Sequence, residues 1–424
     1  MTTPHRGALG AFLDSGATYW SAMLLVGVLN LGFNVIAAQH LGPVAYGDLA
    51  AVLALINLFL VAIGAVTRTV TAIVARLEDL AVSAWLLRSG SVWMTLIGTA
   101  AVILVGSLAR PVAALLHLDD PAWVWIAAVA LVPGHTGAIT TGILQGLRLF
   151  RQSGGVNLAG AAVKFGALLL LLHAGLGVTG GALASLAEVT IIWGGAYLVL
   201  IPLLRRLHPR RLDLAADYRE LLALPVALTV ARMLFFNLDI LMARHYLSAQ
   251  DAGLFAALGV TGRIIAYGTG ALPPVIYPYL VRYRADHSLM AKYLGLALAA
   301  TALCGGGVIA VFYLAPNVIV GALFGAAFAQ IAPFVGWYGV AFLLYALTYV
   351  LLHYLLAEET WWVWVYALGG GMLEAAALVV FHAGIAQFTE VVTACFALIF
   401  VITAAHAAVY VLRPPKRSLQ AVPA

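Results

Sequence analysis

Residues 39–51 read QHLGPVAYGDLAA, and residues 245–257 read HYLSAQDAGLFAA. The second stretch starts 206 positions after the first (245 minus 39), which is close to half of the 424-residue chain. Each contains a glycine followed by two consecutive alanines, so that Gly47 aligns with Gly253. At the same spacing Arg76 aligns with Arg282. The doubled stretch predicts a chain built from two related halves.

The composition places both halves in a membrane. The sequence is 64% hydrophobic and only 9% charged, with a mean hydropathy of +1.02. A soluble domain is about half apolar and about a quarter charged, so lipid must cover the excess apolar surface. The two cysteines, Cys304 and Cys395, lie in apolar runs without metal-ligand spacing, and we expect no metal site, disulfide or cofactor.

The apolar runs predict twelve membrane-spanning helices, because each run approaches the ~20 residues that a bilayer requires. An even number of spans per half gives both halves the same orientation, as in parallel repeats. The expected fold is all-α, with two parallel six-helix bundles around a central cavity: residues 1–204, a cytoplasmic linker at 205–218, and residues 219–424. The predicted spans are 17–38, 46–74, 84–109, 121–146, 154–174, 178–204, 219–244, 250–280, 291–314, 328–356, 361–382 and 389–412.

The basic residues orient these spans. Loops on one side carry most of the lysines and arginines, including RRLHPRR at 205–211, whereas the opposite side holds only Arg110 and Arg244. Cytoplasmic loops are enriched in Lys and Arg, so both termini are predicted to be cytoplasmic in the inner membrane. The same placement explains the net charge of +5 without a nucleic-acid partner.

Three stretches carry a family resemblance: LGPVAYGDLAAVLAL at 41–55, GILQGLRLF at 142–150, and NLDILMARHYLSAQDAGLFAALGVTGRI at 237–264. They are similar to the polysaccharide transporter (Wzx-type) branch of the MOP flippase superfamily, which includes the MATE-like fold. The resemblance implies a flippase that moves undecaprenyl-pyrophosphate-linked oligosaccharide or polysaccharide repeat units by alternating access. It implies a lipid-linked glycan and membrane lipids as partners, together with glycan polymerase or glycosyltransferase machinery.

Charged residues inside the predicted spans are the candidate functional groups. Each costs roughly 2.5–3.5 kcal/mol at the centre of a membrane helix, so such residues are usually functional or paired. The four basic groups outnumber the three acidic ones, which favours a cationic chamber for an anionic pyrophosphate. The predicted substrate contacts are Arg68, Lys164, Arg232 and Arg263, and the candidate ion-coupling residues are Glu188, Asp239 and Glu374.

Each basic residue also has a structural interpretation. Lys164 either contacts substrate or is neutralised by Glu188 on the next span. Arg68 either faces the chamber or extends its long side chain to the membrane interface. Arg263 aligns with Asn57 in the first half, which favours a shared polar lining; the alternative is an ion pair with an acidic residue.

The predicted span 219–244 carries further polar residues. Arg232 and Asp239 are seven residues apart, roughly 10 Å along one helix face, with Asn237 between them. They form either a chamber-facing stripe or an interhelical ion pair. Asn34 and Asn237 are expected to bond glycan hydroxyls, with interhelical packing as the alternative.

The sequence leaves two other classes of function to consider. A MATE-like ion-coupled drug or metabolite antiporter would favour acidic residues in its chamber, against the small cationic excess here. An enzyme would need catalytic residues, usually on a sizeable outer loop, and the predicted outer loops are short. The sequence therefore predicts a transporter and not an enzyme.

Overall fold

The computed structural model describes residues 5–211, 219–270, 272, 276–277, 280, 283, 286–358 and 360–412. These residues are almost entirely helical and include no β-strand. They divide into two compact units, one formed by residues up to 257 with 322–328, and the other by 258–321 with the residues from 329 onward. These units group residues by their contacts and do not test a repeat in the sequence. The two predicted bundles therefore stay predictions, as does the linker between them: residues 1–204, 219–424 and 205–218.

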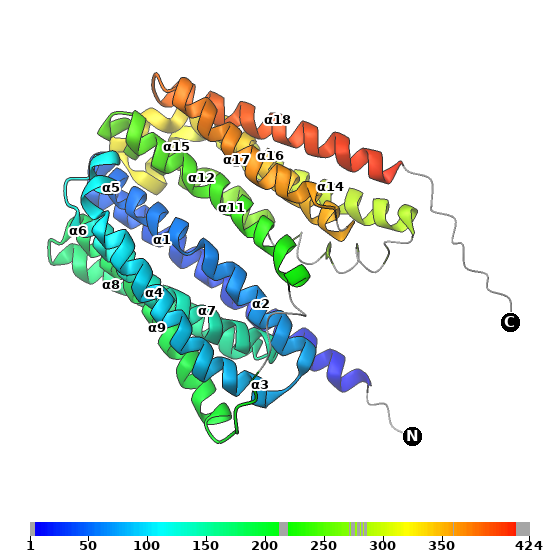
Figure 1. Ribbon diagram of the computed structural model, residues 1–424. Helices are drawn as coiled ribbons and strands as arrows, with labels where there is room; N and C mark the ends of the chain where they lie inside the picture. Colours follow the sequence, from blue (N-terminus) through cyan, green and yellow to red (C-terminus); the bar gives the residue numbers. More distant parts are fainter. Residues whose placement is uncertain are drawn as a thin grey trace. The chain divides into compact units, whose positions relative to one another are not determined.

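The first unit contains most of the long helices (Figure 1). Helix α7 is its centre, packed by α2, α4 and α9, while α8 packs between α1 and α9. The elements are α1 (His5–Phe59), α2 (Val61–Leu77), α3 (Leu80–Trp85), the π-helix η1 (Leu86–Gly90), α4 (Ser91–Ser107), α5 (Ala109–Leu115), α6 (Ala122–Val129), α7 (Leu131–Gly146), α8 (Phe150–His173), α9 (Gly177–Leu204), α11 (Arg219–Tyr246) and the start of α12 (Ala249–Thr269).

The second unit is organised around α16. This helix packs against α14 and α18, and α17 packs against α18. Phe342 of α16 lies 5.3 Å from the Tyr338 ring and 6.1 Å from the ring of Phe396 in α18, which gives the unit an aromatic core. Its elements are the rest of α12, α14 (His287–Leu314), α16 (Ala332–Ala357), α17 (Trp362–Val380) and α18 (Ile385–Val411). The helix α15 (Pro316–Phe324) and the 3₁₀-helix η2 (Ala326–Ile331) are divided between the units, because residues 322–328 belong to the first.

The helices confirm a polytopic all-α membrane protein. Ten segments of the described residues are long and apolar enough to cross a bilayer. The first, Ser21–Leu77, contains two predicted spans, 17–38 and 46–74, and the other nine each match one. The remaining predicted span, 219–244, coincides with α11. A short helix follows the third long helix in each half, α5 at Ala109 and α15 at Pro316.

The doubled stretch marks two structural features of the first unit. At Gly42 the backbone adopts φ 70° and ψ 174°, which kinks α1 between its two predicted spans. Glycine tolerates positive φ, and Pro43 after it has no backbone N–H to bond. The two aligned glycines also meet: a Cβ on Gly47 would lie 2.9 Å from Gly253 N, and one on Gly253 would overlap the Pro43 carbonyl oxygen. The two repeated stretches therefore touch through their backbones.

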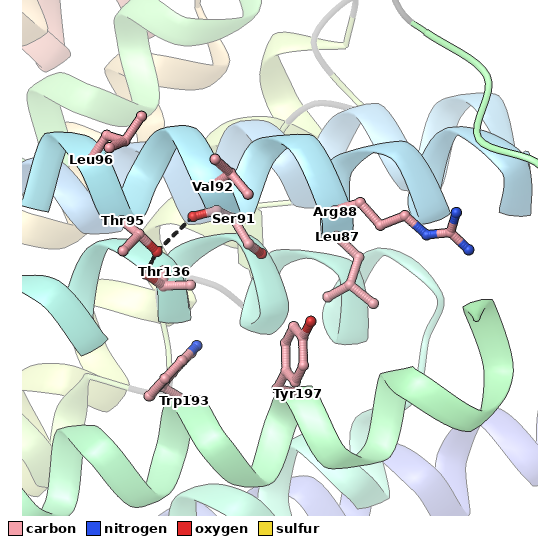
Figure 2. Close-up of a pocket in the computed structure, with 9 residues that line it drawn as sticks. All are labelled: Leu87, Arg88, Ser91, Val92, Thr95, Leu96, Thr136, Trp193 and Tyr197. Carbon is pink, nitrogen blue, oxygen red and sulfur yellow. Dashed lines mark hydrogen bonds between the residues drawn. The ribbon is translucent and has the colours of Figure 1, made fainter.

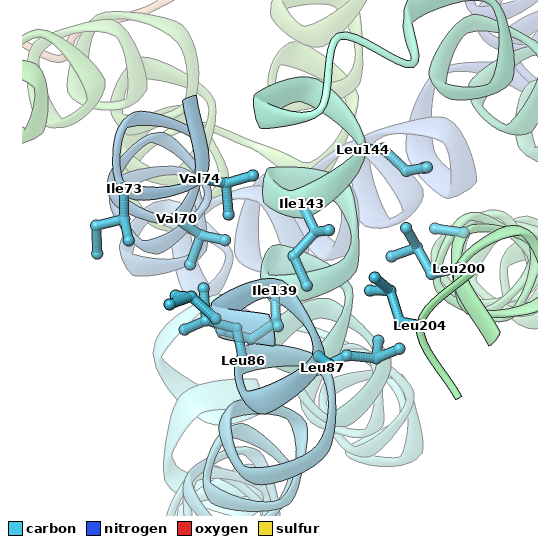
Figure 3. Packing of buried hydrophobic residues seen from close by; sticks show 13 residues of the cluster. Val70, Ile73, Val74, Leu86, Leu87, Ile139, Ile143, Leu144, Leu200 and Leu204 are labelled. Atoms are coloured by element: carbon cyan, nitrogen blue, oxygen red, sulfur yellow. The ribbon is translucent and has the colours of Figure 1, made fainter. Parts of the chain in front are cut away.

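A buried apolar cluster holds the helices of the first unit at the end nearest the 205–211 segment (Figure 3). It contains Val70, Ile73 and Val74 of α2 and Ile139 and Ile143 of α7, and Val70 and Val74 point toward α7. Burying a side chain of this size stabilises by about 1.5–3 kcal/mol. The cluster also receives Leu86 and Leu87 from η1 and Leu200 and Leu204 from α9, so it fixes the spacing of the four helices.

Candidate functional site

Lys164 lies at the centre of a polar cluster inside the first unit. Its Nζ is 2.8 Å from Glu188 Oε2, and the two side chains are only 13% and 16% exposed. The ammonium also donates to Asn30 Oδ1 at 2.9 Å and lies 4.7 Å from the centre of the Phe33 ring. Helices α1, α8 and α9 supply these groups. The neutralising pair offered as the alternative for Lys164 is therefore present, and contact with substrate stays a prediction.

Asn34 extends this cluster toward the doubled stretch. Its side-chain amide donates to the Asn30 carbonyl oxygen at 2.8 Å, one turn earlier in α1. Its Oδ1 accepts a 3.0 Å bond from the hydroxyl of buried Tyr46. These bonds tie Asn34 into helix packing, and its predicted role toward glycan hydroxyls stays a prediction.

Arg68 lies on the accessible side of α2. The helix is amphipathic, because Val70 and Val74 are buried against α7 while Arg68 is exposed. The Thr67 and Thr71 hydroxyls donate to the carbonyl oxygens one turn before them, at 3.0 Å and 2.8 Å. Their hydrogens are therefore already used within the helix. A charged residue inside a span faces a polar interior, pairs with another polar group or extends to the interface, so the predicted contact of Arg68 with substrate stays a prediction.

Asn237 and Asp239 lie on α11 in the interior of the same unit, 6% and 1% exposed. Asn237 Oδ1 accepts a 3.3 Å bond from the side chain of Asn57. Asp239 Oδ1 accepts a 2.8 Å bond from the Ile240 backbone N–H. Asn57 is the residue that the repeat aligns with Arg263, and in the structure its side chain contacts α11 through Asn237.

The remaining predicted site residues lie elsewhere. The side chain of Arg232 is outside the described residues. Arg263 of α12 is half-buried and Glu374 of α17 is fully buried, both in the second unit. The predicted convergence of Arg232, Arg263 and Lys164 on one chamber therefore stays a prediction.

One cluster was missed by sequence reasoning. Asp48, in the first doubled stretch, forms an ion pair with Arg244, directly before the second, and both residues are buried. Arg244 also donates to the His117 carbonyl oxygen at 2.6 Å, and the His117 ring stacks on His245 at 5.7 Å. The available signal was a carboxylate at the start of one span and an arginine at the end of another. It was overlooked because 196 residues (244 minus 48) separate the two.

Comparisons of the whole chain identify the architecture. Lipid II flippase MurJ, solved in an inward closed conformation, superimposes with a TM-score of 0.70 and 13% identity, over 92% of this chain and 87% of that one. An inward-facing multidrug resistance MATE family transporter of the MOP superfamily gives 0.61 with 13% identity, over 91% and 95%. The eukaryotic MATE transporter AtDTX14 gives 0.58 with 14% identity, over 95% and 100%. The chain therefore has the fold shared by these flippase and MATE transporter structures.

This likeness extends to fold alone, because identities of 11–15% carry no residue roles. No protein-family description matches the sequence, and no curated protein is similar to it in sequence. The shared fold confirms the expected all-α, MATE-like architecture, and the resemblance to the Wzx-type branch stays a prediction.

Proposed function

We propose that this chain is a flippase of the Wzx type for a lipid-linked saccharide that carries a pyrophosphate. The observation that carries the proposal is Arg68, an exposed arginine within a membrane span whose opposite face is packed apolar core. Such groups in membrane spans mark substrate or ion pathways, pair with other polar groups or extend to the interface, and the proposal assigns Arg68 to a substrate path. In this proposal the protein lies in the inner membrane with both termini cytoplasmic and acts as a transporter, not an enzyme.

The physical task explains why arginine suits this path. A pyrophosphate-saccharide headgroup cannot enter hydrocarbon without replacing its hydration. Arginine offers five donors in a planar fork that matches phosphate oxygens. In the proposed path Arg68 binds the phosphate, and Arg232 and Arg263 add positive charge. The fold likeness supports this class of cargo, since one structurally similar protein is a lipid II flippase.

The second candidate is an ion-coupled antiporter, as in MATE transporters. The pair between Glu188 and Lys164 favours it, because a mostly buried carboxylate can exchange its cationic partner for a proton or metal ion. Asp239 and Glu374, both buried, are the other candidate coupling groups. The same groups can couple a flippase to an ion gradient, so cargo distinguishes the two functions.

Complementation of a deletion strain tests the proposal. Deletion should cause a pyrophosphate-linked saccharide to accumulate on the cytoplasmic leaflet, and the wild-type gene should clear it. Arg68→Ala should lose at least tenfold in clearance while Arg68→Lys retains part of it. Arg76→Ala is the matched control, because Arg76 lies in the last turn of the same helix.

Two results would contradict the flippase. One is full clearance by Arg68→Ala at normal membrane abundance. The other is unchanged saccharide in the deletion strain together with lost resistance to cationic drugs, which would support the antiporter.

A further inference from the structure

A groove on the first unit lies between α4 and α9, over α7. Its volume is about 290 Å³, close to the ~300 Å³ lower end for small-molecule sites. Figure 2 shows Ser91 and Thr95 of α4 facing Trp193 and Tyr197 of α9 across it. Val92 and Leu96 at its border are 59% and 55% exposed. Exposed apolar residues on a membrane span face lipid, so the groove opens to the bilayer.

Two polar atoms in this groove lack hydrogen-bond partners. The Ser91 hydroxyl is buried, in a residue only 8% exposed, and the Trp193 Nε1–H is buried as well; neither has a partner among the residues that the structure describes. The neighbouring hydroxyls are satisfied, since Thr95 bonds the Ser91 carbonyl at 2.8 Å and pairs with Thr136 at 3.0 Å. An unpaired polar group in an apolar setting costs free energy. The groove therefore offers two donors to a ligand with an oxygen acceptor.

The backbone beside the groove is locally widened. Residues Leu86–Gly90 form a π-turn, in which the Ser91 N–H bonds the Leu86 carbonyl. Single π-turns inside helices occur frequently at functional sites. Here the turn supplies Leu87 and Arg88 to one end of the groove and places Ser91 directly after them.

Basic groups border the same end. Arg88 is exposed, and its Nη2 donates to the carbonyls of Arg205 at 2.7 Å and Leu207 at 3.3 Å. These bonds engage one of its two terminal nitrogens. They hold the segment RRLHPRR, residues 205–211, against the groove end, with Arg205, Arg206 and Arg211 exposed. Arg210 is already paired, because its guanidinium lies 3.1 Å from Asp79.

We propose that this groove binds one anionic glycerophospholipid of the surrounding membrane. The phosphate lies at Arg88 and the exposed arginines beside it. An ester carbonyl accepts from Trp193 Nε1–H and the Ser91 hydroxyl, and an acyl chain follows Val92 and Leu96. Ser91 is three residues from Arg88, roughly 4–5 Å along the helix, and the ester groups of a glycerophospholipid lie one glycerol unit below its phosphate.

The basic residues and the two unpaired donors of the groove favour an anionic glycerophospholipid. Basic pockets between membrane helices at the cytoplasmic surface bind anionic headgroups, and a bare acyl chain would leave the two donors unsatisfied. The site is separate from Arg68 and from the Lys164 cluster. It is independent of the proposed cargo, because the lipid stays bound at the surface.

Native mass spectrometry of the purified full chain tests the site with three probes: phosphatidylglycerol, its diether analogue without ester carbonyls, and phosphatidylcholine. Wild type should retain one phosphatidylglycerol in preference to the other two. Arg88→Gln should weaken phosphatidylglycerol about fivefold, the effect of one interfacial charge. The double variant Ser91→Ala with Trp193→Phe should lose the preference for diester over diether.

Matched variants separate the groove from general effects. Arg151→Gln changes an exposed arginine at the start of α8, and Thr99→Val changes an exposed residue of α4 beyond the groove; both should leave binding unchanged. The melting temperature in lipid-free detergent shows whether the double variant remains folded, because Trp193→Phe removes ring carbons as well as the unpaired Nε1–H. Should that variant unfold, Arg88→Gln carries the test.

Three results would overturn the proposal: equal retention of phosphatidylcholine, unchanged binding in Arg88→Gln, or a diester preference that survives in a folded double variant.

Discussion

At the scale of single residues, Lys164 and Glu188 show how a membrane interior accommodates charge. The ammonium has three partners, the carboxylate, Asn30 and the Phe33 ring. Lys164→Met removes the cation from Glu188 and should destabilise by about 3 kcal/mol, as for a broken buried pair. Glu188→Gln leaves Lys164 two partners and should cost about 1 kcal/mol.

Thermal unfolding in detergent measures both variants and their combination. The double variant should be less destabilised than the sum of the two single variants, because the pair acts as a unit. Strict additivity would show that the ion pair contributes no coupling.

We expect the stability of the protein around Asp79 to depend on pH. It precedes α3, where its carboxylate accepts the Ala81 N–H at 2.8 Å and contacts Arg210. The bond from Ala81 holds the pKa of Asp79 below its usual range, and Arg210 lowers it further. Because the pKa of Asp79 is lower in the folded protein, its carboxylate stabilises the fold above about pH 4, and this stabilisation is lost as acid protonates the carboxylate.

Hydrogen exchange, corrected for intrinsic rates, measures the effect. Peptides covering 80–85 and 205–211 should lose protection below about pH 4 in wild type. Asp79→Ala should expose both peptides already at neutral pH and abolish the transition. An unchanged acid transition in Asp79→Ala would assign it to another group.

At the scale of helices, the pair of Asp48 and Arg244 joins α1 to α11. Both groups are buried, and Arg244 also holds the His117 carbonyl. Arg244→Met should destabilise by about 3–5 kcal/mol, because it leaves a buried carboxylate unpaired. The apolar double variant Asp48→Leu with Arg244→Met should recover part of this loss.

Calorimetry of the purified protein compares these variants with Arg110→Met. Arg110, the other basic residue on the predicted outer side, is exposed and should tolerate the change. Equal melting temperatures for Arg244→Met and Arg110→Met would contradict a structural role for the pair.

The helix crossing at Gly253 is the second element-scale test. A methyl group there would overlap the Pro43 carbonyl, whereas a Cβ on Gly268 of the same helix meets nothing within 4 Å. Gly253→Ala should therefore lower the melting temperature, and Gly268→Ala should leave it unchanged or raise it slightly. Unfolding curves of the two variants give the comparison, and equal stability would contradict the close approach.

Sequence reasoning predicted the helices well because apolar runs of bilayer length have few alternative structures. The described residues of each predicted span are mainly helical, although some spans contain two or more helices, and Lys164 meets the carboxylate named as its alternative partner. The pair of Asp48 and Arg244 was not predicted, because periodicity within a helix does not encode which helices become neighbours. The groove at Ser91 was missed for a related reason, since a π-turn shifts side chains away from regular helical spacing.

At the scale of the whole molecule, the chain combines a fold shared with a lipid II flippase with polar groups inside its spans. Such groups are costly in lipid, and the proposed function assigns some of them to a path for a charged headgroup. A protein that moves such a headgroup should work with purified components, because the path belongs to the chain itself.

Reconstitution into sealed vesicles therefore tests the central claim most directly. A fluorescent prenyl-pyrophosphate disaccharide is incorporated in both leaflets, and a membrane-impermeant quencher reports the fraction that remains inside. The account predicts that the purified protein makes the protected fraction accessible, that Arg68→Ala slows this at least tenfold, and that fluorescent phosphatidylcholine stays protected. A folded wild-type protein that leaves the disaccharide lipid protected would contradict it.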